Sequence, residues 1–98
     1  MRRHRRAKIV ATLGPKTSNQ ESIEKLFIAG ADVFRLNFSH GTHDEHRDRL
    51  NMVRAIEQNL NRPIAIMADL QGPKLRVGKF NNGKTTLIAG SEFILDLS

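Results

Sequence analysis

The chain has 98 residues, of which 39% are hydrophobic and 27% are charged, a balance typical of a soluble globular protein and not of a disordered one. It contains no cysteine, which excludes disulfide bonds and thiolate metal sites. No apolar run approaches the roughly 18 residues of a membrane span. We therefore expect a cytoplasmic protein without a membrane partner.

The first seven residues form a basic leader that holds four arginines and supplies most of the net charge of +6. The rest of the chain has twelve lysines and arginines against ten acidic residues, so its charges nearly balance. Clustered arginines can bind RNA or an acidic lipid surface, but no nearby aromatic residues offer a stacking platform for single strands. We expect a solvated leader. The alternative is that the chain is a basic βα module, which binds nucleic acid or another partner through this arginine-rich leader.

The first βα unit is predicted from an apolar run and a helix start signal. The β-branched run 8–13 predicts a buried strand. Ser18 stands three residues before Glu21, the spacing of a capping box, and predicts a helix near 19–30 that ends at Gly30. The buried side of this helix is predicted by apolar residues at helical spacing, Ile23, Leu26 and Phe27.

The second unit repeats this order. A strand is predicted at 32–38, and Thr42 with Glu45 forms another capping box for a helix at 43–60. The buried side of that helix is predicted to consist of Leu50, Val53, Ile56 and Leu60. A third strand is predicted at 64–69, and its residues 64–68 are continuously apolar, as in strands that are covered on both faces. This alternation of strands and helices predicts an α/β fold with parallel pairing.

After the third strand the pattern changes from helical spacing to short strands. These are predicted at 75–80, 85–89 and 92–97. The Asn-Asn-Gly sequence at 81–83 is a turn signal of the hairpin type. Residues 74–98 are therefore predicted to start a small all-β domain that is truncated. Residues 8–73 are predicted to be the first part of an α/β barrel, because a closed barrel needs about eight strands and roughly 250 residues.

Arg35 lies inside an otherwise apolar strand, where an unpaired cation would cost several kcal/mol. A guanidinium group there requires an anionic partner, either a carboxylate or a phosphate. The chain offers Asp32 and Asp69 as carboxylates for a structural ion pair. A phosphate-binding role for Arg35 remains equally open on chemistry alone.

Polar side chains lie at or just after the ends of the second and third predicted strands. Asn37, Ser39 and Asp69 offer an amide oxygen, a hydroxyl and a carboxylate, which suit alkali or alkaline-earth cations. Ordinary loop hydrogen bonding explains each of them singly.

Three histidines recur every third residue, at His40, His43 and His46, and suggest a zinc site. Their interval spans a strand end, a turn and a helix start, so the rings need not converge. We expect His43 and His46 on the exposed first turns of the helix, and no physiological metal.

Three segments together resemble the opening of the pyruvate kinases, in the same order and at similar intervals. They are KIVATLGP at 8–15, FRLNFSHGT at 34–42 and ADLQGPKLRVG at 68–78. The resemblance covers most of the chain. It implies the first βα units of a (β/α)8 TIM barrel followed by the start of a small β domain.

The resemblance also implies a function for the parent protein. Pyruvate kinases transfer the phosphoryl group of phosphoenolpyruvate to ADP in glycolysis, giving pyruvate and ATP, and use Mg²⁺. Family members are commonly homotetramers. The catalytic lysine and the Mg²⁺ ligands match positions beyond residue 98, so the chain alone is expected to be inactive.

Roles for individual residues come from the same resemblance. Arg35 matches the position that binds the phosphate of phosphoenolpyruvate. The nucleotide-binding positions match Asn37, Phe38, Ser39, His40 and Arg76. The positions that hold a monovalent cation, usually K⁺, match Asn37, Ser39, Asp69 and the backbone carbonyl of Leu70.

One departure from the family pattern concerns this cation site. Potassium-dependent members typically read Asp-Thr-Lys-Gly-Pro-Glu where this chain reads Asp-Leu-Gln-Gly-Pro-Lys, from Asp69 to Lys74. Lys74 therefore places an ammonium group where a carboxylate is usual. The chain resembles the potassium-independent variant, in which a fixed positive charge replaces the bound ion.

Overall fold

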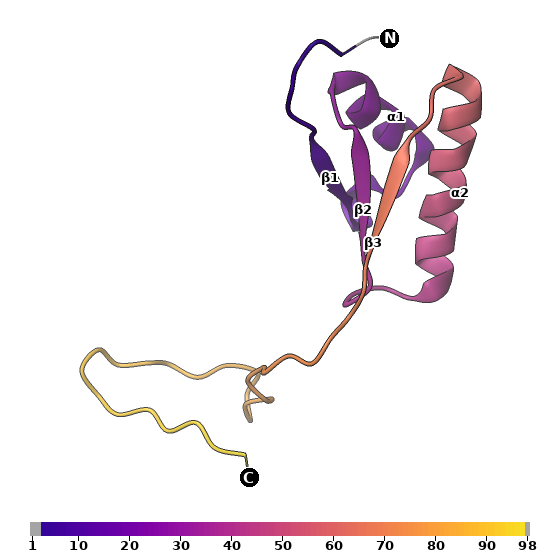
Figure 1. Ribbon diagram of the computed structural model, residues 1–98. Coiled ribbons are helices and arrows are strands. Elements are labelled where there is room, and N and C mark those ends of the chain that lie inside the picture. The colour runs from indigo at the N-terminus through magenta and orange to yellow at the C-terminus, as the bar shows by residue number, and fades with distance from the viewer. Residues whose placement is uncertain (1–2, 98) are drawn as a thin grey trace.

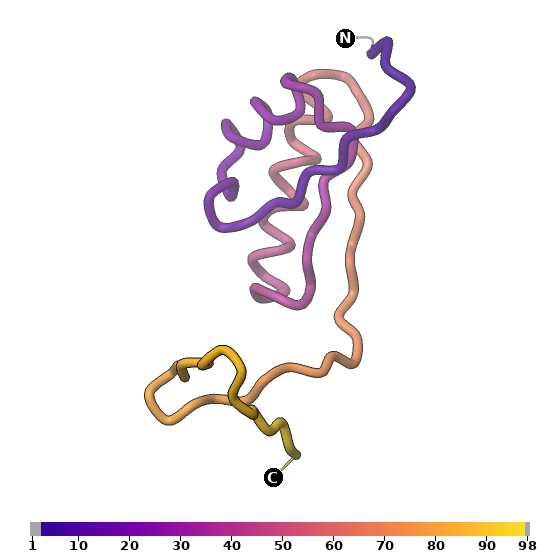
Figure 2. The backbone as a smooth tube through the Cα atoms, turned by 90° about the vertical axis from the view of Figure 1, so that its left-hand side faces the viewer, coloured from indigo at the N-terminus to yellow at the C-terminus, as the bar shows by residue number. Residues whose placement is uncertain are grey.

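The computed structural model describes residues 3–97. In chain order the elements are β1 (Val10–Leu13), the short 3-10 helix η1 (Pro15–Thr17), α1 (Gln20–Ala29), β2 (Val33–Asn37), α2 (His43–Leu60) and β3 (Ala65–Asp69). Figures 1 and 2 show the strands in one layer, both α-helices on one side of it, and an extended segment that leaves the layer after β3. The predicted strands and helices up to Asp69 are therefore confirmed.

The sheet has three strands in the order β1-β2-β3, and both pairings are parallel. The register places Thr12 beside Arg35 and Asn37 beside Asp69. The carboxyl ends of β2 and β3 therefore lie at one edge, as the alternation of strands and helices predicts.

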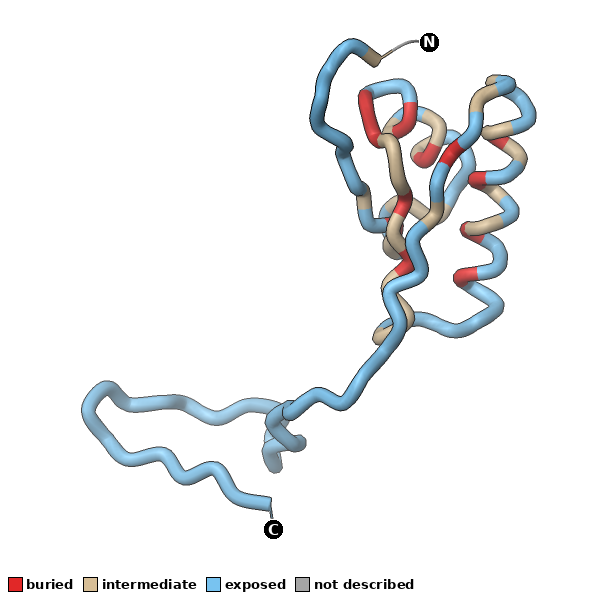
Figure 3. Tube along the Cα trace, viewed as in Figure 1, coloured by how far each residue is buried: buried red, intermediate tan, exposed pale blue. Residues whose placement is uncertain are grey.

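The core lies between the sheet and the two helices. Its buried apolar side chains are Leu13, Ile23, Phe27, Ala31, Phe34, Leu36, Val53, Ile56 and Ile64. Within β2, burial alternates, so that Phe34 and Leu36 are buried while Arg35 is only half-buried on the other face. Figure 3 shows buried positions on β2 and along α2, whereas most of β3 is exposed.

Burial of both sheet faces is not observed. Val10 and Met67 are 46% and 45% exposed, and β3 has no buried residue. Among residues 3–97 the helices pack against only one face, so the coverage of both faces that the apolar strand predicts is not observed in this part of the fold.

The helix ends follow the local sequence closely, with one shift. Thr42 and Glu45 form the predicted capping box, with Glu45 N donating to Thr42 Oγ1 at 3.2 Å. Helix α1 is capped by Asn19, whose Oδ1 accepts from Ser22 N at 2.8 Å. The predicted capping box at Ser18 is therefore wrong by one residue, because Ser18 instead donates its hydroxyl to the carbonyl of Gly14 at 2.7 Å. Gly30 ends α1 as predicted, at a φ of 139° that favours glycine.

The segment after β3 is extended and exposed. Within the described residues 70–97 no strand forms, so the strands predicted at 75–80, 85–89 and 92–97 are not observed in this chain. The turn at 81–83 is confirmed, with Gly83 N donating to Phe80 O at 2.9 Å. Short strands need a third strand or a packing layer to be stable, and the described part of the chain gives this segment neither.

Two arginines of the basic leader, Arg3 and Arg5, contact the folded layer. Arg3 Nε lies 3.1 Å from Asp32 Oδ1, and Arg5 lies 3.0 Å from Asp32 Oδ2. Arg3 also donates to the carbonyls of Phe27 and Ala31, and its guanidinium lies 4.8 Å from the centre of the Phe27 ring. The expectation of a solvated leader is therefore wrong for these two arginines. Both guanidinium groups pair with Asp32 within the chain.

Asp32 is the anion at the centre of this arrangement. The backbone N–H of Ile9, 2.7 Å from Oδ2, is the main cause that lowers the pKa of the Asp32 carboxyl, and the charges of Arg5, Arg3 and Lys8 add to it. Carbonyls at the end of α1 also favour nearby cations. The leader therefore ties the end of α1 to the start of the sheet.

Among the residues described, no helix combines the length and apolar character that a membrane crossing requires.

Candidate functional site

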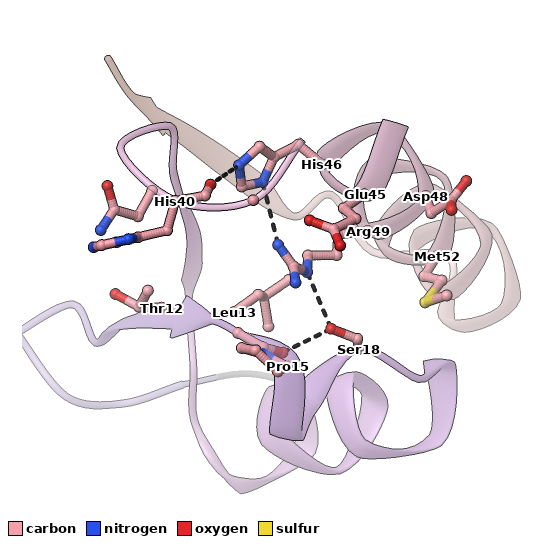
Figure 4. A pocket seen from close by; sticks show the side chains of 13 residues that line it. Thr12, Leu13, Pro15, Ser18, His40, Glu45, His46, Asp48, Arg49 and Met52 are labelled. Carbon is pink, nitrogen blue, oxygen red and sulfur yellow. Dashed lines mark hydrogen bonds between the residues drawn. The ribbon is translucent and has the colours of Figure 1, made fainter. Parts of the chain in front are cut away.

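A cavity of about 670 Å³ opens at the carboxyl ends of β1 and β2. One wall is the turn after β1, with Gly14 and Pro15, and another is the turn after β2, with His40. The first half of α2 supplies the third wall, including His46 and Arg49 (Figure 4). Ligands of parallel α/β sheets bind outside the carboxyl ends of the strands, so this cavity is in the expected place.

Arg35 lies next to this edge, on the sheet face opposite the helices. Its Nε donates to Asp69 Oδ2 at 3.0 Å, NH2 contacts the same oxygen, and NH1 donates to Thr12 Oγ1 at 3.1 Å. Asp69 is therefore its carboxylate partner, while Asp32 is paired with the leader.

The ion pair leaves Arg35 accessible to a ligand. Its side chain is 28% exposed and that of Asp69 is 47% exposed. Exposed pairs of this kind contribute only about 0–1 kcal/mol, so an incoming phosphate can compete for the guanidinium. The pair holds the guanidinium at the edge of the sheet and does not bury it.

The candidate oxygen ligands of a cation lie on neighbouring strand ends. Asn37 Oδ1 accepts from Ser39 N at 3.0 Å, and the N–H of Phe38 donates to the backbone carbonyl of Asp69 at 2.9 Å. Lys74 Nζ lies 3.5 Å from Ser39 Oγ. Leu70 follows Asp69 directly and is 74% exposed. The ammonium of Lys74 therefore contacts one of the candidate ligands of the cation.

The residues assigned to the nucleotide are only partly brought together. Asn37 and His40 line the cavity, and Ser39 follows in the same turn. The Phe38 ring stacks on the His46 ring, with centroids 4.5 Å apart, and packs against the core. Arg76 is exposed in the extended segment and does not line the cavity.

His46 and Arg49 are the residues whose environment the sequence reasoning missed. They are 4% and 7% exposed, so the prediction that His46 lies on an exposed turn is wrong, while His43 is exposed as predicted. Their spacing offered a signal, because 46, 49, 53 and 56 follow one face of a helix whose last two positions are apolar. Polar side chains thus continue the buried stripe of α2 toward the cavity.

The three histidines do not converge on a common point. His46 Nε2 contacts the backbone carbonyl of His40 at 2.7 Å, and its other ring nitrogen faces Arg49. Over residues 3–97 we find no group of three or more histidines and carboxylates arranged to hold a metal ion.

The geometry first defines a class. Parallel strands joined by helices, with a guanidinium and oxygen donors at their carboxyl ends, are typical of α/β proteins that bind anionic ligands at this edge. A family model described as "Pyruvate kinase, barrel domain" matches residues 4–98. The chain belongs to the pyruvate kinase family.

Comparisons with curated proteins agree. The chain is 53% identical to the pyruvate kinase of Haemophilus influenzae over 95 residues, which is 97% of this chain. It is 53% identical over 96 residues to the pyruvate kinase of Methylorubrum extorquens, and 52% identical over 95 residues to pyruvate kinase II of Salmonella typhimurium. The chain spans 20% of the length of each of these relatives.

Proposed function

We propose that this chain is the N-terminal part of a pyruvate kinase. Residues 8–73 would begin a (β/α)8 barrel, and residues 74–98 would begin the small β domain. The whole enzyme would transfer a phosphoryl group from phosphoenolpyruvate to ADP. By analogy with the family, it would be a cytoplasmic homotetramer.

The position of Arg35 is the observation that carries this proposal. Its guanidinium lies on the open face of the sheet, at the edge where ligands bind, and hydrogen bonds to Thr12 and Asp69 orient it. Phosphoryl transfer depends mainly on positioning and charge neutralisation. A planar fork of N–H donors suits the oxygens of a phosphate. Arg35 would therefore bind the phosphoryl group in transfer.

The nucleotide would bind beside Arg35, in the cavity at the ends of β1 and β2. Asn37, Ser39 and His40 lie at the turn that borders this cavity, and Phe38 would contribute its backbone, since its ring is turned toward His46. Arg76 would join the site only once the segment after β3 packs against further parts of the enzyme. Mg²⁺ would supply charge neutralisation of the phosphates, with ligands outside this chain.

The cation site would use a fixed charge. Asn37, Ser39, Asp69 and Leu70 occupy the positions that hold K⁺ in the family, and their oxygens suit such an ion. Lys74 Nζ already lies 3.5 Å from Ser39 Oγ. We propose that this ammonium replaces the potassium ion.

The decisive test is Arg35→Lys in the full-length enzyme. Lysine keeps the charge but loses the bidentate fork, so kcat/KM for phosphoenolpyruvate should fall about 100-fold or more. Arg47→Lys, on the exposed side of α2, is the matched control and should leave the rate unchanged. A wild-type enzyme that makes no pyruvate from phosphoenolpyruvate and ADP would contradict the proposed function.

The 98-residue chain should make no pyruvate by itself. One face of its sheet is exposed, and it spans 20% of the length of its relatives. A coupled assay with phosphoenolpyruvate, ADP and Mg²⁺ measures this. Turnover above that of a mock purification would show that the catalytic groups lie within these residues.

A further inference from the structure

Two buried polar side chains connect the loops on either side of the cavity, and the function proposed above uses neither. His46 Nε2 lies 2.7 Å from the carbonyl of His40, in the turn after β2. Arg49 NH1 lies 3.3 Å from His46 Nδ1, and Arg49 Nε donates to Ser18 Oγ at 3.1 Å. Figure 4 shows these bonds as one continuous chain across the cavity wall.

The partners determine the proton positions on His46. A carbonyl oxygen can only accept a hydrogen bond, so Nε2 must carry the proton that it donates to His40. A guanidinium can only donate, so Nδ1 must be unprotonated to accept from Arg49. Each partner therefore selects the same neutral form of the ring. A buried network whose members are all satisfied is rigid.

The turn after β2 is fitted closely onto this ring. Phe38 stacks on His46 with an angle of 26° between the ring planes. Gly41 has a φ of 75°, and a Cβ there would lie 2.8 Å from Glu45 Oε2 and 3.4 Å from His46 Nε2. This φ favours glycine, and a side chain there would require Glu45 to move.

The turn after β1 is fixed at the other end of the chain of bonds. The Ser18 hydroxyl, which accepts from Arg49, also donates to the carbonyl of Gly14 at 2.7 Å. Thr17 Oγ1 accepts from the N–H of the same glycine at 2.9 Å. Both turns that border the cavity are thus held at a set distance from α2, and hence from each other.

We propose that His46 and Arg49 are positioning residues that set the width of the nucleotide cavity. The proposal rests on the proposed function, which places the nucleotide there. Arg35 lies on a strand and has its own contacts to Thr12 and Asp69. Loss of the network should therefore weaken nucleotide binding and spare phosphoenolpyruvate.

The test compares Arg49→Met with Arg47→Met in the full-length enzyme. Both variants remove a guanidinium from the same region of α2, but Arg47 is exposed and Arg49 is buried. Arg49→Met should raise KM for ADP about three- to tenfold, the effect of losing one or two hydrogen bonds. KM for phosphoenolpyruvate should stay within about twofold, and Arg47→Met should change neither.

Two variants of His46 separate positioning from packing. In His46→Gln the amide can still donate to His40 and accept from Arg49, so KM for ADP should stay near the wild-type value. His46→Ala should raise it about as much as Arg49→Met does. The effect on KM for ADP of combining His46→Ala with Arg49→Met should be less than additive, because both changes break the same network. Thermal melting identifies any variant that fails to fold. If Arg49→Met does not fold, Arg49→Lys, which keeps the charge, takes its place in the comparison.

Equal rises in both KM values, additive effects, or no difference between Arg49→Met and Arg47→Met would overturn the proposal. Calorimetric binding of MgADP to the same variants distinguishes its failure from that of the proposed function. If the wild type binds MgADP but makes no pyruvate, the proposed function is wrong. The positioning role of His46 and Arg49 is then still tested by the MgADP binding constants of the variants. If Arg49→Met binds MgADP as tightly as the wild type, the positioning role is wrong.

Discussion

The layer formed by residues 10–69 and the segment formed by residues 70–97 both carry large apolar side chains, but only the first buries them. Phe34 is fully buried between β1, β3 and the helices, whereas Leu75 is 98% exposed. In the layer, each strand has a neighbour and a helix to pack against. The segment has strand-like residues and a correct turn, but no strand to pair with among residues 3–97. The local sequence pattern defines which secondary structure a segment prefers. Whether a strand forms depends on a neighbouring strand and a packing layer.

The largest expected effect follows directly from this difference. Phe34→Ala should destabilise the chain by about 3–5 kcal/mol, because it leaves a cavity in the core. Phe93→Ala, in the extended segment where the ring is 49% exposed, should change stability by less than about 0.5 kcal/mol. Urea unfolding of the chain followed by circular dichroism measures both. A comparable loss for Phe93→Ala would show that the segment packs in solution.

A second, smaller effect concerns Lys74, which reaches from the segment to Ser39 in the layer. The full-length enzyme should not need potassium, and Lys74→Glu should create a requirement for it. The change removes the fixed positive charge and adds a negative one, so a bound cation should restore activity several-fold. Leu70→Thr can be added, because a hydroxyl there could complete the oxygen shell of the ion.

The measurement is the initial rate against potassium concentration at constant ionic strength, with a tetraalkylammonium salt as the control. Strong activation of the unmodified enzyme by potassium would contradict charge replacement. In that case Asn37, Ser39 and Asp69 must suffice to hold the ion.

The smallest effect is a change in how stability depends on pH. The pKa of Asp32 is lowered from its usual value of 3.8 in the folded chain, mainly by the Ile9 N–H. Its stabilisation is therefore fully present above the unfolded pKa and is lost as pH falls through the folded one. Asp32→Asn should melt below the wild type at neutral pH, and the difference should shrink below about pH 4. A difference that does not change with pH would mean that the carboxylate charge is unimportant.

Much of the layer could be predicted from the sequence because its signals are local. The capping box at Thr42, the C-cap at Gly30 and the apolar strand 64–69 depend on neighbouring residues alone. The cap of α1 was misplaced because Ser18 and Asn19 are both good caps, and only the contact with Gly14 decides between them. The strands predicted in the extended segment are not observed for the opposite reason, since the partners that such strands need are not local.

The candidate site was predictable only in part. The polar residues at the strand ends were visible, and parallel pairing brings Asn37 and Asp69 together. The sequence could not show that Arg35 pairs with Asp69 and not with Asp32. That outcome depends on a distant contact, because arginines about 27 residues earlier in the chain already pair with Asp32. The burial of His46 likewise depends on Arg49 and the turn above it. The roles in binding came from family resemblance, not from the residue pattern.

The folded-back leader has a practical consequence for anyone who produces this protein. Arg3 and Arg5 hold the carbonyls that end α1 and neutralise Asp32, so these early residues are part of the fold. Trimming the first seven residues, or cleaving a tag within them, would expose a carboxylate and a helix end together. An affinity handle is better placed at the opposite end of the chain. Protein trimmed in this way should be cut by proteases near Gly30 more readily than untrimmed protein of otherwise identical sequence.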